Sequence, residues 1–154
     1  MGTATLDDRT MTIERSFRAP PEAVYGAWTD PEALPRWFGP AGFSCRTHRI
    51  DVRVGGEWVF DMEGHGLTFP NRHRWTELVP PAAAGAGRIA FLMDGLDGRA
   101  PKEVTVTLSP EGTGTRLRQV MVFPDLEDLA LARSYDAEAR GRETLGKLAA
   151  ALGE

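Results

Sequence analysis

The three histidines, His48, His65 and His73, are the side chains best suited to acid–base chemistry near neutral pH. None has the spacing of a metal site, such as two histidines four residues apart on a helix, so we expect no metal. A histidine could still pair in space with a carboxylate such as Asp61 or Glu57. Because such a pair is defined first by geometry, the sequence leaves acid–base catalysis open as an alternative.

The available nucleophiles have no activating surroundings in the sequence. Ser44, Ser109 and Ser134 lack the flanking residues of a nucleophile elbow. Cys45 is the only cysteine, and in a predicted strand a buried, inert thiol is its usual state. A single cysteine also excludes an intramolecular disulfide and a multi-cysteine metal site. We therefore assign no catalytic residue and expect no cofactor.

The composition is typical of one globular domain. Of 154 residues, 42% are apolar and 26% are charged, and the formal net charge is −4. We place the domain at residues 11–154, after a flexible start at residues 1–10. An acidic balance without a polybasic run argues against nucleic acid as a partner. No apolar run approaches the ~18 residues of a membrane span, and residues 1–10 lack a signal pattern, so the expected location is cytoplasmic.

The first forty residues predict a strand and two short helices. Alternation of apolar and polar residues over 11–18 indicates the strand. Pro20-Pro21 stops it and favours a helix over residues 22–29, because proline suits the first helical position. Asp30-Pro31 then opens a second short helix that runs through Trp37.

A β pattern continues from residue 43 to residue 123. Gly55-Gly56 and Gly112-Thr113-Gly114 are typical of hairpin turns. The glycine- and alanine-rich stretch 80–87 predicts a flexible loop. Short connections favour an antiparallel meander, since parallel crossovers need about a dozen residues or more. The predicted strands are residues 43–54, 57–63, 72–79, 88–94, 103–109 and 115–123.

One long helix is predicted after Pro124-Asp125, with Asp125 as its N-cap. At helical spacing, one apolar stripe contains small residues in its first half and leucines in its second. The predicted fold class is therefore α+β: a curved antiparallel sheet of about six to seven strands around a long C-terminal helix. A cavity would lie between them. The stripe consists of Ala130, Ser134, Ala137, Gly141, Leu145, Leu148 and Leu152.

Short motifs in a fairly specific order run from about residue 11 to residue 152. They are Phe17-Arg18-Ala19-Pro20, Val24, Ala27-Trp28-Thr29-Asp30-Pro31, Trp37-Phe38-Gly39-Pro40, Asp51, Gly55-Gly56-Glu57-Trp58, Pro70-Asn71-Arg72 and Thr115-Arg116-Leu117. In this order the chain resembles the START-like (helix-grip, SRPBCC) superfamily, and within it the subfamily named after the activator of the ninety-kilodalton heat-shock-protein ATPase. The resemblance implies a helix-grip fold with a cavity; most members bind hydrophobic small molecules, and some are enzymes.

Candidate ligand-binding residues come from the aromatic and apolar faces of these elements. Trp37 and Phe38 could form a rim at one end of the cavity, or join the core. The alternating strand residues could either pack against the helix or line the cavity. Arg74 could hold a carboxylate if its face pointed inward, whereas an outward, solvated arginine is the alternative. The candidates are Trp37, Phe38, Trp58, Phe60, Arg74, Trp75, Phe91, Met93, Ser134, Tyr135 and Gly141.

The leading hypothesis is a small-molecule-binding domain with an apolar cavity that holds a hydrophobic or amphipathic ligand. Two alternatives remain open. One is an enzyme of the cyclase or hydrolase type, using His73 or His65 with a carboxylate. The other is an interaction protein that stimulates a chaperone ATPase. A homodimer is compatible with all three hypotheses.

Overall fold

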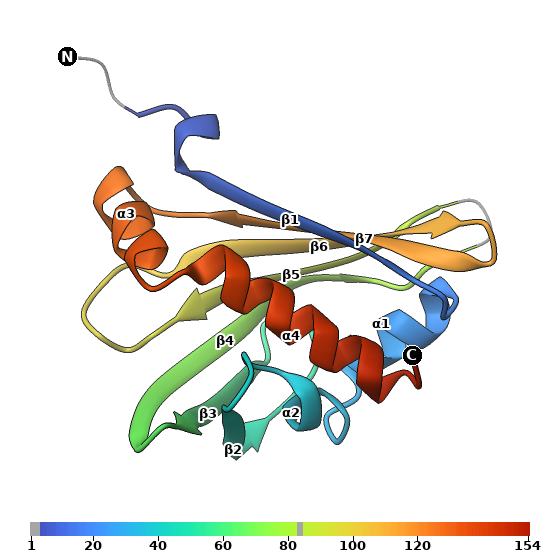
Figure 1. The fold of residues 1–154 in the computed structure, drawn as a ribbon, viewed down its shortest axis with the longest axis horizontal. Helices are drawn as coiled ribbons and strands as arrows, with labels where there is room; N and C mark the ends of the chain where they lie inside the picture. Colours follow the sequence, from blue (N-terminus) through green and yellow to red (C-terminus); the bar gives the residue numbers. More distant parts are fainter. Residues whose placement is uncertain (1–3, 83–84) are drawn as a thin grey trace.

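An antiparallel sheet of seven strands carries the helices on one face, with α4 crossing it diagonally (Figure 1). The computed structural model describes residues 4–82 and 85–154. The strands are β1 (Thr10–Phe17), β2 (Ser44–Ile50), β3 (Glu57–Gly64), β4 (Leu67–Val79), β5 (Gly87–Asp94), β6 (Lys102–Glu111) and β7 (Gly114–Val122). The helices are the 3-10 helix η1 (Asp7–Arg9) and α1 (Pro21–Thr29), α2 (Leu34–Trp37), α3 (Leu126–Ser134) and α4 (Ala137–Ala151).

The strand order is β1-β7-β6-β5-β4-β3-β2, and every neighbouring pair is antiparallel. Strands β2 to β7 form the predicted meander, and β1 joins it by pairing with β7. The hairpin glycines behave as expected, since Gly55 and Gly112 have φ values of +83° and +62°. A Cβ on Gly56 would lie 2.1 Å from the carbonyl oxygen of Asp51, so only glycine fits there. The predicted helix-grip fold class is confirmed.

Two strands differ from their predicted bounds by more than two residues at one end, whereas the others agree within two residues. β2 ends at Ile50 instead of residue 54. β4 begins at Leu67 instead of residue 72, because His65 and Gly66 alone form the turn after β3, with φ values of +53° and +76°. Pro70 lies within β4, opposite Asp61. Its ring fits the extended backbone of the strand.

The core lies between the sheet and α4, and large aromatic side chains fill the half nearest α1 and α2. Trp28, Trp37, Trp58 and Trp75 are all buried. The indole Nε1 of Trp37 donates a hydrogen bond to the carbonyl oxygen of Ala27, 3.0 Å away, which ties α2 to α1. Leu145 and Leu148 of the stripe complete this core from α4 together with the neighbouring Ala149, and all three are buried.

The C-terminal helix is divided in two, whereas the sequence predicted one continuous helix. Asp125 caps α3 as expected, accepting a hydrogen bond from the backbone N–H of Asp128 at 2.8 Å. α3 ends at Ser134, and Asp136 adopts the left-handed conformation with φ +57° before α4 begins. Aspartate tolerates this conformation better than most residues, because its short polar side chain can bond locally. The break lets α3 cover one end of the sheet while α4 crosses it (Figure 1).

Two flexible segments predicted from the sequence include positions outside the described residues. Residues 1–3 of the predicted flexible start and residues 83–84 of the predicted loop lie outside the described residues. Beyond residue 3, the chain forms η1, and Arg9 Nη1 donates to the carbonyl oxygen of Phe123, 2.5 Å away. In residues 4–82 and 85–154, no helix combines the length and the apolar character needed to cross a membrane.

Candidate functional site

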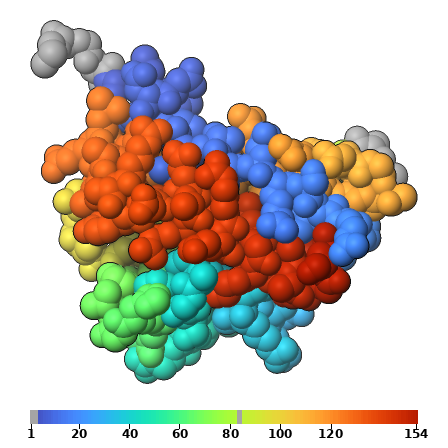
Figure 2. All heavy atoms as spheres, in the orientation of Figure 1, coloured from blue at the N-terminus to red at the C-terminus, as the bar shows by residue number. Residues whose placement is uncertain are grey.

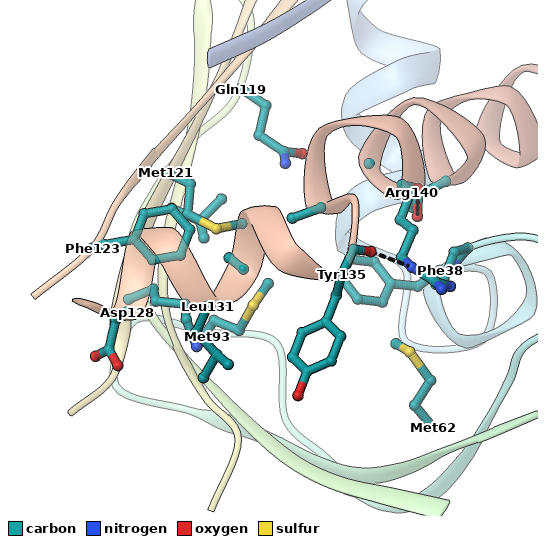
Figure 3. Close-up of a pocket in the computed structure, with 18 of the residues that line it drawn as sticks. Phe38, Met62, Met93, Gln119, Met121, Phe123, Asp128, Leu131, Tyr135 and Arg140 are labelled. Atoms are coloured by element: carbon teal, nitrogen blue, oxygen red, sulfur yellow. Dashed lines mark hydrogen bonds between the residues drawn. The ribbon is translucent and has the colours of Figure 1, made fainter. Parts of the chain in front are cut away.

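A pocket lies between the two C-terminal helices and the inner face of the sheet (Figure 3). Its volume is about 360 Å³, near the lower end of the roughly 300–1,000 Å³ of small-molecule sites. Leu131 and Ala132 reach it from α3, and Gly141 and Thr144 from α4. On the surface, α4 crosses the middle of the molecule and α3 covers its left end (Figure 2). The break between them therefore places two helical segments on one side of the pocket.

Methionines and aromatic rings form most of the apolar wall. Met62, Met93 and Met121 reach the pocket from β3, β5 and β7. Phe38, which follows α2, and Phe91 on β5 add aromatic surface. Methionine is unbranched and polarizable, so it adapts to ligands of different shapes. This wall suits an apolar ligand body.

An ion pair between exposed Arg99 and buried Asp128 closes the pocket near α3. The guanidinium of Arg99 donates to the carboxylate of Asp128, which is only 5% exposed. This hydrogen bond, together with the negative charge of Asp128, raises the pKa of Arg99. Asp97 also turns toward this corner, where its Oδ1 accepts from the backbone N–H of Arg99 at 3.1 Å. The pair joins the β5–β6 connection to the first turn of α3.

Two further cations line the pocket, Lys102 at the start of β6 and Arg140 in α4. Arg140 donates from Nε to the carbonyl oxygen of Tyr135 at 2.7 Å, as the dashed line in Figure 3 shows. Within the described part of the chain, no carboxylate lies at ion-pair distance from either cation. Their charges are therefore available to a bound molecule.

Five of the predicted site residues line this pocket, and they come from four separate segments. Phe38, Phe91 and Met93 form part of its apolar wall, whereas Tyr135 lies at its edge with 62% of the residue exposed. Gly141 contributes no side chain. A Cβ there would lie 2.9 Å from Cδ1 of Ile13, so the glycine lets α4 approach β1 closely.

The other six predicted residues lie outside the pocket. Arg74 is exposed, on the face of β4 opposite buried His73, so the arginine face points outward. The hydroxyl of Ser134 donates to the carbonyl oxygen of Leu131 at 2.5 Å, within the last turn of α3. The remaining four, Trp37, Trp58, Phe60 and Trp75, are buried in the core next to the pocket.

His73 lies inside the fold, but it has no acidic partner. It is 3% exposed and packs against the rings of Phe38, Trp58, Phe60 and Phe91 at centroid distances of 4.8–5.4 Å. Burial lowers its pKa to about 3, which leaves the imidazole neutral, and its Nε2 has no hydrogen-bond partner among the described residues. A catalytic role as a histidine–carboxylate pair has no geometric support here.

The remaining candidates for chemistry are on the outside or inert. His48 Nε2 lies 3.0 Å from Asp61 Oδ2, so this anticipated pair does form, but on the exposed outer face of β2 and β3. His65 is exposed in the turn after β3. The thiol of Cys45 donates to the carbonyl oxygen of Phe38 at 3.3 Å, and burial raises its pKa to about 12. Such a thiol is unreactive near neutral pH.

Sequence reasoning missed much of the β7 side of the pocket and its charged corner. Gln119 and Met121 lie on the inner face of β7, in alternation with outward residues. That alternation was a usable signal. Arg99 lies in the connection between β5 and β6, and Lys102 is the first residue of β6. No periodic pattern could place these two residues beside α3.

The chain matches the family model described as Activator of Hsp90 ATPase homolog 1-like protein over residues 18–153. A solved protein of Chromobacterium violaceum is 29% identical, with a TM-score of 0.76 over 92% of this chain and 95% of that one. The AHSA1 protein of Silicibacter pomeroyi is 25% identical, with a TM-score of 0.71 over 94% and 97%. A protein of Arthrobacter aurescens, 22% identical, has the same fold at a TM-score of 0.81 over 97% and 89%. No curated protein matches the chain.

Proposed function

The chain belongs to the family described as Activator of Hsp90 ATPase homolog 1-like protein, and from that premise we propose that it is a small-molecule-binding domain. Its ligand is hydrophobic or amphipathic and lies in the pocket between α3, α4 and the inner face of the sheet. The observation that carries the proposal is the pocket wall, where the half-buried side chains of Met93 and Met121 present an adaptable apolar surface beside buried Phe91. Small-molecule sites have this composition, with a few polar groups added.

Binding in this pocket is favoured because the wall groups are only partly covered by protein. Met62, Met93 and Met121 are half-buried, whereas the aromatic residues behind them are fully buried. A ligand body would remove this remaining apolar surface from water, at about 25 cal/mol per Å². Acid–base catalysis has less support, because His73 contacts aromatic rings and no carboxylate.

The proposal is tested with a neutral apolar probe, N-phenyl-1-naphthylamine, by its fluorescence and by the melting temperature. Saturation at about 100 times the Kd adds about 2.7 kcal/mol to the free energy of unfolding, which corresponds to a rise in Tm of roughly 5–10 °C for a chain of this size. Ala132→Trp places a large ring in the pocket and is expected to abolish binding. Ala150→Trp, on an exposed position of α4, is the matched control and should bind normally.

Native mass spectrometry of the purified protein supplies an independent measurement. A bound apolar metabolite that is retained by Ala150→Trp and lost from Ala132→Trp would support the proposal. Failure of the probe to bind, or equal binding by the two variants, would count against a ligand in this pocket.

A further inference from the structure

The pocket carries an excess of positive charge in a chain that is acidic as a whole. Three cationic side chains and two carboxylates line the pocket, whereas the formal net charge of the chain is −4. Both carboxylates are already engaged by Arg99, Asp128 through its guanidinium and Asp97 through its backbone N–H. Lys102 and Arg140 are therefore the charges left for a ligand.

Cations on the outer face of the sheet are in a different situation. Arg46 lies at ion-pair distance from both Asp61 and Glu63, and Arg72 from both Glu57 and Asp94. The outer face therefore neutralises these arginines within the protein itself. Lys102 and Arg140 instead border the apolar wall of the pocket, and among the described residues neither has a carboxylate at ion-pair distance.

Arg140 is held in a position suited to a carboxylate. Its Nε is occupied by the carbonyl oxygen of Tyr135, which fixes the guanidinium at the break between α3 and α4. Its two Nη atoms have no hydrogen-bond partner among the described residues. In Figure 3 the Arg140 side chain extends toward Phe38, beside the apolar wall. A planar guanidinium with two free nitrogens binds a carboxylate with two parallel hydrogen bonds, and pre-orientation lowers the entropy cost.

We infer that the ligand is an anionic amphipath, an apolar body with one carboxylate, whose carboxylate binds Arg140 while its body lies against the methionine wall. Lys102 adds to the positive potential without a fixed hydrogen bond. This inference rests on the proposed function, because it concerns the same pocket. It adds the charge of the ligand and the residue that recognises it.

The experiment compares dodecanoate, below its micelle concentration, with dodecan-1-ol as competitors of N-phenyl-1-naphthylamine. The two have the same chain and differ in the headgroup. We expect dodecanoate to bind the natural sequence about tenfold more tightly, as for a charge-assisted hydrogen bond. Arg140→Gln should remove most of that preference and leave dodecan-1-ol unchanged. Arg140→Lys should keep part of it, because the charge remains.

Two further variants complete the test. Lys102→Gln should reduce the preference by a smaller factor that shrinks at high salt. Arg74→Gln removes an exposed cation from the outer face and should change neither affinity. Equal binding of dodecanoate and dodecan-1-ol, or an equal loss of both in Arg140→Gln, would overturn the inference while leaving a ligand pocket in place. If neither competitor displaces a bound probe, the inference also falls. If the probe itself does not bind, the proposed function falls with it.

Discussion

Arg140 on α4 donates a hydrogen bond from Nε to the carbonyl oxygen of Tyr135, 2.7 Å away, across the break between the two C-terminal helices. This bond satisfies a carbonyl that the end of α3 leaves without a helical partner. It also ties the first turn of α4 to the edge of the pocket. The break is thus stabilised by a specific hydrogen bond, and Asp136 adopts the left-handed conformation between the two helices.

Replacing Asp136 tests how strongly this break depends on the left-handed backbone. Asp136→Val should lower the free energy of unfolding by about 1–2 kcal/mol, because a β-branched residue is strained at φ +57°. Asp136→Gly should be neutral or slightly stabilising. Urea unfolding measures both changes.

Ala139→Val is the matched control for the valine substitution, since Ala139 is exposed on the first turns of α4. It should cost only the lower helix propensity of valine, roughly 0.5 kcal/mol. Equal losses for Asp136→Val and Ala139→Val would mean that the chain is not held in a left-handed turn at this point.

The architecture could be predicted because local signals marked its turns. Gly55-Gly56 and Gly112-Thr113 lie at sharp reversals that few other residues could form, and short connections force antiparallel pairing. The helix break was missed because Tyr135 and Asp136 do not interrupt the spacing of small residues along the stripe. The break is needed only because α3 and α4 run in different directions over the sheet (Figure 1), which the spacing of residues does not reveal.

The site was harder to predict because one pattern serves two environments. Phe60 and Phe91 both face inward on their strands, yet Phe60 lies in the core and Phe91 reaches the pocket. The difference is set by where α4 crosses the sheet, and alternation along a strand carries no such information. Gln119 was missed because it is polar. The inner face of a strand usually carries apolar residues, so a polar residue there indicates a pocket only once the pocket is known.

The Arg99–Asp128 pair is expected to hold α3 against the sheet. Arg99→Gln leaves a nearly buried carboxylate without its cation, which is costly unless the segment moves toward water. Hydrogen exchange of the backbone amides of α3 should therefore accelerate, while exchange in α4 stays unchanged.

Arg133→Gln provides the control on the same helix. Arg133 forms an exposed pair with Glu138 at 3.6 Å, and exposed pairs contribute little to stability. Its α3 amides should exchange as in the natural sequence. If the α3 amides of Arg99→Gln and Arg133→Gln exchange alike, the Arg99–Asp128 pair does not hold the helix.

His73 predicts a specific sensitivity to acid. Its pKa is about 3 in the fold, whereas the ordinary histidine pKa is 6.5, so between these values the unfolded chain binds a proton that the folded chain excludes. The free energy of unfolding therefore falls as pH drops from 6.5 toward 3, by at most about 1.4 kcal/mol per pH unit, and this residue adds no pH dependence above about 6.5.

The comparison of the natural sequence with His73→Phe isolates this contribution. Between pH 7 and pH 5 the natural sequence should lose about 2 kcal/mol more than the variant in urea unfolding. The test depends on the difference in slope, so a constant change in stability from repacking the ring does not affect it. Parallel pH profiles would show that the imidazole can be protonated within the fold.

Two glycine substitutions test the junction between the first and last strands. Gly114 begins β7 where β1 ends, and a Cβ there would lie 2.2 Å from the carbonyl oxygen of Phe17. Gly114→Ala must therefore push two backbones apart. Gly26, inside α1, has nothing within 4 Å of its Cβ position. Gly26→Ala should stabilise the protein by about 0.5–1 kcal/mol, because alanine favours the helix.

The two substitutions should therefore have opposite signs although both are glycine to alanine. Gly114→Ala should cost more than the roughly 1 kcal/mol that a compatible alanine would add, measured as a fall in the urea midpoint. The loss should come with faster hydrogen exchange at the β1–β7 ladder, since relief of the contact requires those strands to separate at Phe17. If Gly114→Ala were as stable as Gly26→Ala, β1 and β7 could not approach each other as closely as described. The register in which β1 pairs with β7 at the edge of the sheet would then be wrong.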